Sequence, residues 1–218
     1  MTVAATNAAR TQTDRFPNAQ RKLWEYGCNI GLAACYLVFS WGMLGDFMRT
    51  HRLSSLLLTL FETLIVFYSL CRPAPKQINR SLYDWTVALG GTFILLLLRP
   101  APQVNDHAAI LVLQFLGMSI SLIALFSLNR SWGLVAANRG VKTGGMYGIV
   151  RHPIYAGYFV SFAAYLAQNA TMTNVPIYVA FVWLEVLRMG AEERVLARDP
   201  EYVSYSIRTR WRVLPFIY

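Results

Sequence analysis

The chain has 218 residues, of which 56% are hydrophobic and only 14% charged, and its net charge is +9. Soluble globular domains carry about 25% charged residues, so this composition indicates a protein that lies in lipid. The basic residues stand singly between apolar blocks and form no basic face, which argues against nucleic-acid binding. The cysteines show no CxxC spacing, so neither a zinc site nor a disulfide framework is expected.

The apolar segments, taken in chain order, predict an all-α, polytopic integral membrane protein. Residues 1–26 form a polar tail without an apolar core, so no cleavable signal peptide is expected. A spanning helix needs about 20 mostly apolar residues. Six segments approach this length, the third and fifth being short: 27–48, 53–71, 82–98, 108–128, 154–169 and 174–190. We divide the chain into the tail, a region of four spans (27–128) and a region (129–218) with spans five and six and a C-terminal amphipathic segment.

The distribution of positive charge predicts how these spans are oriented. If the N-terminus is cytoplasmic, seventeen of the 20 Lys and Arg residues fall on the inner side: in the tail, the inner connections, the inner end of the sixth segment and the C-terminal segment. The outer connections hold only Arg49, Arg52 and Arg99. Positively charged loops stay on the cytoplasmic side. The split therefore predicts six spans with both termini in the cytoplasm, in a bacterial inner membrane or the endoplasmic reticulum.

The run 140–157, GVKTGGMYGIVRHPIYAG, carries much of the candidate chemistry at the start of the fifth segment. Its glycines, among them Gly145, allow a tight turn and close approach to a ligand, although glycine clusters also occur in ordinary loops. Pro153 suits the first turn of a helix, whose free N–H groups favour an anionic ligand. Arg151 can clamp the same anion, or it can be an anchor at the membrane interface.

Aromatic side chains and a histidine surround this turn. Tyr147, Tyr155 and Tyr158 have the character of a membrane-interface belt, but their ring faces can also hold a cation such as a sulfonium. His152 by itself is more typical of a structural hydrogen-bonding group than of a catalyst. Its neighbours make it a candidate for a binding site.

A second polar cluster, AEER at 191–194, ends the sixth segment. Arg188 and Glu192 are four residues apart and share a helical face. Carboxylates such as Glu185, inside the sixth segment, and Glu62, inside the second, need partners because charge is costly at membrane depth. The cluster is either a surface ion-pair network or part of a site. We expect it to converge with the first cluster and form one cofactor pocket.

The C-terminal stretch 199–218 mixes tyrosine, tryptophan and phenylalanine with arginine. Basic and aromatic residues together favour a helix that lies on the membrane surface. Placed over the pocket, the same stretch would act as a lid or recognise an acidic substrate.

In order, RHPIYAG, EERVL, YVSY and VLPFIY resemble the pattern of the isoprenylcysteine carboxyl methyltransferase family over about residues 129–218. The resemblance implies a membrane methyltransferase that uses S-adenosyl-L-methionine, with a pocket open to the cytosol and a lipid substrate entering from the bilayer. We assign cofactor binding to Gly145, Tyr147, Val150, Arg151, His152, Pro153, Tyr155, Glu192 and Glu193. We assign catalysis to Glu193 and Arg208. The family often has Gly-Pro-Tyr-Arg before the motif, whereas this chain has Gly-Met-Tyr-Gly at 145–148 and lacks that arginine.

The chemistry of methyl transfer fits these residue types. Displacement at a sulfonium depends on positioning and charge placement, and an ionised acceptor such as the isoprenylcysteine carboxylate needs no base. His152 would position the cofactor, and no metal is expected. The expected partners are membrane lipids and a lipophilic or prenylated acceptor. Two alternatives remain open: a sterol-type membrane reductase with a nicotinamide cofactor, and a non-enzymatic membrane carrier or assembly factor.

Overall fold

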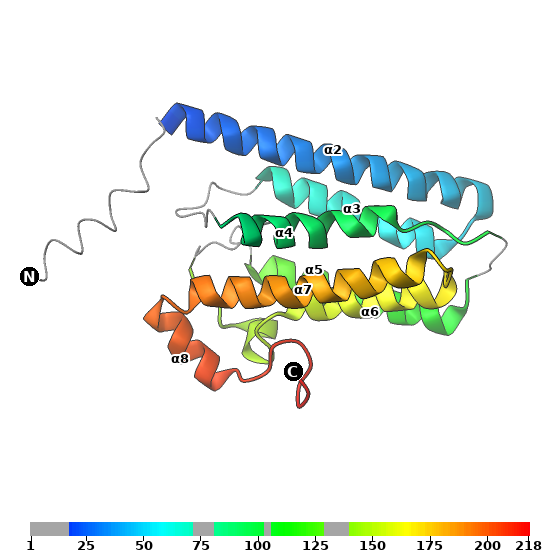
Figure 1. Ribbon diagram of the computed structural model, residues 1–218. Coiled ribbons are helices and arrows are strands. Elements are labelled where there is room, and N and C mark those ends of the chain that lie inside the picture. Colours follow the sequence, from blue (N-terminus) through cyan, green and yellow to red (C-terminus); the bar gives the residue numbers. More distant parts are fainter. Residues whose placement is uncertain (1–17, 72–80, 103–105, 129–139) are drawn as a thin grey trace, which may run out of the picture.

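The computed structural model describes residues 18–71, 81–102, 106–128 and 140–218, and every regular element within them is a helix. The helices α2 to α7 form an elongated bundle with their axes roughly aligned, and α8 lies obliquely at one end (Figure 1). They are α2 (Asn18–Thr50), α3 (Leu53–Cys71), α4 (Leu82–Ile94), η1 (Leu95–Leu97), α5 (Ala108–Leu128), η3 (Gly145–Gly148), α6 (Pro153–Gln168), α7 (Asn174–Leu196) and α8 (Pro200–Arg208). The all-α prediction is confirmed over these residues.

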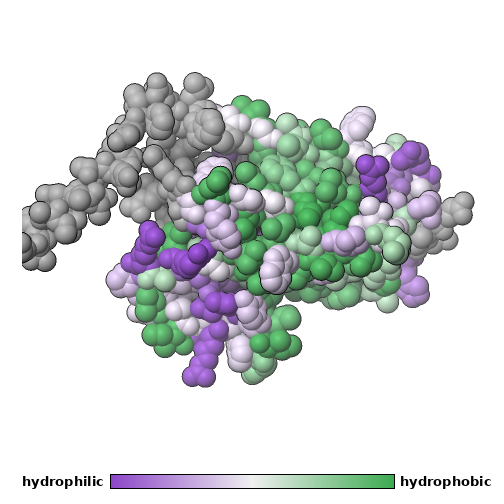
Figure 2. Space-filling model, viewed as in Figure 1, coloured by the Kyte–Doolittle hydropathy of each residue, from purple (hydrophilic) through white to green (hydrophobic). Residues whose placement is uncertain are grey.

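Two of the described helical stretches, Asn29–Thr50 and Ala108–Leu128, are long and apolar enough to cross a membrane. Two shorter stretches, Leu53–Tyr68 and Leu82–Leu97, are also apolar. On the face shown in Figure 2, hydrophobic residues cover the middle of the bundle and hydrophilic residues gather towards its ends. This surface fits a membrane protein, while the six-span topology and the cytoplasmic termini stay predictions.

Two helices extend well beyond the expected boundaries. α2 begins at Asn18, inside the predicted tail, and α7 continues to Leu196, beyond the predicted end at 190. Both extensions are rich in residues with high helix propensity, and neither contains a proline. The AEER cluster therefore lies on the last turns of α7. The rest of the tail (1–17) and the first part of the predicted glycine-rich connection (129–139) lie outside the described residues, as does the inner connection at 72–80.

The helices associate mainly in pairs: α5 with α6, α2 with α3, and α4 with α7. At the α5–α6 contact the backbones meet at Gly117 and Gly157. A Cβ atom on Gly117 would lie 2.6 Å from the backbone nitrogen of Ser161 and 2.8 Å from the carbonyl oxygen of Gly157. Small residues permit such close packing of membrane helices. Gly157, the last residue of RHPIYAG, therefore serves helix packing.

A buried polar network ties the connections together at the end of the bundle opposite the Arg-His-Pro turn. Arg52 donates to the Asn169 side chain (2.9 Å) and the Ala101 carbonyl (3.2 Å), and forms an ion pair with Asp106 (3.4 Å). Asp106 also accepts hydrogen bonds from Ser54. This network joins three connections and fixes how α3, α5 and α6 are set against one another. The charge of Arg52 is thus balanced inside the protein.

Candidate active site

A cavity of about 160 Å³ lies at the end of the bundle where α6 begins. By the same measure a single water needs about 10–15 Å³, so there is room for a ligand group. Its walls come from α2, α3, α4, η1, the end of α5, α6, α7, α8 and the segment before α6. Its polar lining residues are Tyr36, Glu62, Thr92, Lys142, Tyr147, Arg151, His152, Tyr155, Tyr158, Glu185, Arg188, Glu192, Tyr202 and Tyr205.

Part of the predicted cofactor set lines this cavity, namely Tyr147, Arg151, His152, Tyr155 and Glu192. These residues come from the two clusters recognised in the sequence, which lie about 40 residues apart along the chain. The structure therefore brings the two clusters to one place.

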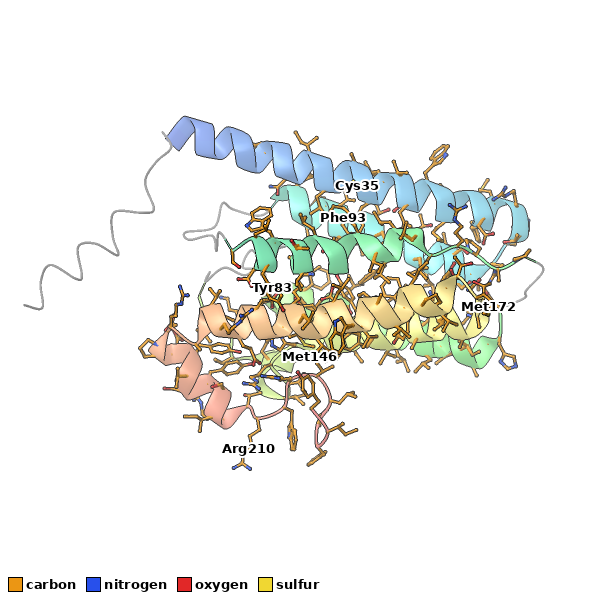
Figure 3. All side chains as sticks on the ribbon, in the orientation of Figure 1. Cys35, Tyr83, Phe93, Met146, Met172 and Arg210 are labelled. Carbon is orange, nitrogen blue, oxygen red and sulfur yellow. The ribbon has the colours of Figure 1, made fainter. Side chains whose placement is uncertain are left out.

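The remaining predicted residues lie beside the cavity rather than on its wall. Pro153 and Val150 are buried next to it. Gly145 is exposed and has φ of 60°, which side-chain-bearing residues rarely adopt, so its role is to make the turn. Arg208 is exposed at the end of α8, and the nearby Arg210 points away from the bundle (Figure 3).

Glu192 and Glu193 have different environments because adjacent residues of a helix point about 100° apart. Glu192 lines the cavity, accepts a hydrogen bond from the Tyr155 hydroxyl (2.6 Å) and pairs with Arg188 (3.4 Å). Glu193 is not on the cavity wall. Its carboxylate pairs with Arg212 (2.7 Å) and Arg151 (3.4 Å).

His152 lies between the two glutamates. Its Nε2 is 3.1 Å from an Oε1 of Glu193, and its Nδ1 is 3.9 Å from an Oε2 of Glu192. With Nε2–H donating to Glu193, the ring is held in place from outside the cavity. Glu193 therefore acts through His152, and we treat it as a positioning residue.

The C-terminal strap, residues 209–218, holds the Arg-His-Pro turn from outside. The backbone N–H of Arg151 donates to the Trp211 carbonyl (2.9 Å), and that of His152 donates to the Arg212 carbonyl (2.7 Å). Burial by itself would raise the pKa of Glu193, but the hydrogen bonds from His152 and Arg212 and the charge of Arg151 outweigh burial and lower that pKa. Glu193 therefore stays ionised and anchors the strap.

We expect the strap to loosen in acid. Because the folded-state pKa of Glu193 is lowered, its stabilising contribution is present above the ordinary glutamate value of about 4.3 and is lost as pH falls through the folded-state pKa. The wild-type protein should melt at a higher temperature than Glu193→Gln at pH 6, and the difference should shrink towards zero below about pH 4. Thermal unfolding in detergent measures this. A constant difference across the range would contradict the ionised anchor.

α8 covers one side of the cavity. The sequence predicts that this side faces the cytoplasm. The Tyr205 hydroxyl donates to the Tyr147 carbonyl at 2.7 Å, and burial raises the pKa of Tyr205 to about 12, so the phenol keeps its proton. Tyr202 also lines the cavity, and its buried hydroxyl has no hydrogen-bond partner among the described residues. The segment expected as a surface helix or lid therefore forms a wall.

Deeper in the cavity, α7 presents a row of charges at Glu185, Arg188 and Glu192. Arg188 lies 3.4 Å from Glu185 and 3.4 Å from Glu192, and its guanidinium stacks 5.6 Å from the centre of the Tyr155 ring. Gly91 on α4 makes room for this row, since a Cβ there would lie 2.6 Å from a carboxylate oxygen of Glu185. Gly91 and Tyr36 could not be recognised as cavity residues from the sequence, because glycine and tyrosine are ordinary in an apolar run. A lone acid such as Glu62 in such a run does indicate a functional residue.

Fold and site together define a helical membrane protein with a charged cavity at one end of its bundle. Residues 109–198 match the model of the isoprenylcysteine carboxyl methyltransferase (ICMT) family. This stretch contains α6, nearly all of α5 and both polar clusters, and it is similar to that family of methyltransferases. The match confirms the family predicted from the sequence, over residues 129–198 of the predicted stretch. A search of curated proteins found no match to the chain.

Proposed function

We propose that this protein is an S-adenosyl-L-methionine-dependent methyltransferase that acts on a lipophilic acceptor. The observation that carries the proposal is the convergence of Arg151, His152 and Glu192 on one cavity, within the stretch that matches the family. The acceptor that the family name implies, the carboxylate of an isoprenylcysteine, is the first to be tested.

The residues present suit the charges of this cofactor. Its carboxylate would be held by Arg151 and by the N-terminus of α6, where no side chain of the described residues caps the helix. Its positively charged sulfur and ammonium groups suit Glu192 and the ring of Tyr155. Buried polar atoms are normally hydrogen-bonded, so the Tyr202 hydroxyl and the Glu185 Oε2, which lack described hydrogen-bond partners, are suited to a ligand.

When bound, the cofactor supplies a methyl group activated by a positively charged sulfur. The chain supplies position and charge. Arg151 and Glu192 orient opposite charges of one ligand, and His152, held by Glu193, keeps the cavity wall in place. The α8 wall, fastened by Tyr205, excludes water. In-line transfer needs correct placement of the reacting atoms more than proton transfer when the acceptor is already ionised.

Binding of S-adenosylhomocysteine to the purified protein in detergent tests the cofactor assignment. At a hundredfold excess over its Kd, a true ligand stabilises the folded protein by about 2.7 kcal/mol, which a thermal shift detects. His152→Ala should weaken this binding about tenfold or more, equivalent to ~1.4 kcal/mol. His107→Ala is the matched control, because His107 is exposed at the far end of the bundle.

Folded protein that binds no S-adenosylhomocysteine would sink the proposal. Stabilisation by NADPH alone would favour the reductase. Equal binding by wild type and His152→Ala would remove the histidine from the site.

A further inference from the structure

Glu62 is the feature of the cavity that the proposed function does not use. It lies on α3, outside the stretch that matches the family, and only 4% of its surface is exposed to solvent. It lines the cavity together with Tyr36 from α2, Tyr158 from α6 and Glu185 from α7. It forms no hydrogen bond or ion pair with the described residues. An unpaired carboxylate buried in this way is costly, which points to a ligand that pairs with it.

The charges around Glu62 indicate the sign of that ligand. We call the residues Glu62, Glu185, Arg188, Tyr36 and Tyr158 the inner end of the cavity. Within it, two carboxylates face one guanidinium, and Arg188 is also shared with Glu192. A carboxylate on the acceptor would place a third acidic group in this buried site beside one guanidinium. A cationic group would instead pair with Glu62.

We propose that the inner end binds the amino head group of a lipophilic acceptor, and that the nitrogen of this amine receives the methyl group. This inference rests on the proposed function and narrows its acceptor class. The neighbouring apolar lining residues Leu95, Phe162 and Phe181 suit the hydrocarbon part of such an acceptor.

The reaction balances with Glu62 as proton acceptor. The bound ammonium gives one proton to the Glu62 carboxylate, because a neutral amine beside a neutral acid is favoured over two separate charges at a buried site. The amine lone pair then forms the new N–C bond to the methyl carbon. The C–S bond breaks, and its electron pair stays on sulfur, which becomes a neutral thioether. The positive charge passes to the methylated nitrogen. Glu185 is less suited as proton acceptor because Arg188 pairs with it.

Three acceptors that differ only in their head group test this inference, together with an isoprenylcysteine whose amine is blocked. The purified protein is given labelled S-adenosyl-L-methionine with dodecylamine, dodecanol, dodecanoate or N-acetyl-S-farnesylcysteine. We expect methylation of the amine to exceed that of the others at least tenfold. Glu62→Gln should lower amine methylation about 100-fold, as removal of a general base does. Its S-adenosylhomocysteine affinity should change less than about threefold, or ~0.7 kcal/mol.

Two further measurements keep the inference open to refutation. Glu201→Gln, an exposed glutamate of α8, is the matched control and should methylate as the wild type does. If Glu62→Gln fails to fold, the wild type alone decides: in the presence of S-adenosylhomocysteine, dodecylamine should raise the melting temperature and dodecanol should not.

Three results overturn the inference. Methylation of a carboxylate with the amine inert assigns the family's acceptor chemistry to this site. An equal loss of cofactor affinity and methylation in Glu62→Gln assigns Glu62 to the cofactor's own ammonium. Unchanged amine methylation in Glu62→Gln would show that Glu62 is not part of the acceptor site. These failures leave cofactor binding by the wild type intact, whereas absence of that binding overturns the proposed function and the inference together.

Discussion

Replacing Arg188 with methionine is expected to cost about 3–5 kcal/mol of stability, the usual cost of leaving a buried charge without its partner. Arg188 is 7% exposed and lies 3.4 Å from both Glu185 and Glu192. Methionine fills similar space but leaves both carboxylates without this cation. Because Glu192 lines the cavity, S-adenosylhomocysteine binding should be lost as well. Thermal or denaturant unfolding in detergent measures the first effect, and ligand-induced stabilisation measures the second.

Arg198→Met is the matched control for this change. Arg198 is exposed just beyond the end of α7, and its replacement should alter stability by no more than about 0.5 kcal/mol, as for most surface substitutions. If Arg188→Met is as stable as this control, the row of charges on α7 contributes little to the fold. If Arg188→Met is stable and still binds the ligand, the charge row is not part of the cofactor site.

Gly157→Ala is expected to destabilise the protein by at least about 1–3 kcal/mol, the usual range for overpacking a close contact. An added Cβ would lie 2.6 Å from the backbone nitrogen of Ser121, and backbone cannot move aside as a side-chain end can. α5 and α6 would have to separate. Since α6 begins at the Arg-His-Pro turn, their separation should also weaken cofactor binding. Unfolding in detergent and S-adenosylhomocysteine titration measure the two effects.

Gly42→Ala supplies the opposite expectation for the same substitution. Gly42 lies within α2, and a Cβ there would meet nothing within 4 Å. Alanine is favoured over glycine in a helix by about 0.5–1 kcal/mol, so this variant should be as stable as the wild type or more so. Destabilisation of both variants to the same extent would show that the α5–α6 contact is not the cause.

The positions of the helices could be predicted from the sequence because each depends on residues that are close along the chain. Runs of apolar residues, and prolines such as Pro100, mark where helices lie and end. The two polar clusters could be recognised in the same way, since charge is rare in such segments. Helix ends were less predictable: the helical propensity of residues 191–196 carries α7 past its apolar part, so both glutamates of the cluster lie on a helix.

What only the tertiary structure decided is which charged groups meet. Glu62 comes from α3, Arg188 from α7 and Arg212 from the C-terminal strap, and no spacing in the sequence relates them. The assignment of Glu192 to the cavity and of Glu193 to the strap follows from how α7 is rotated in the bundle. That rotation is set by contacts between helices far apart in the sequence, such as α4 with α7. The sequence by itself therefore determined a helical protein of the membrane with two polar clusters, and packing between distant helices decided how those clusters form a site.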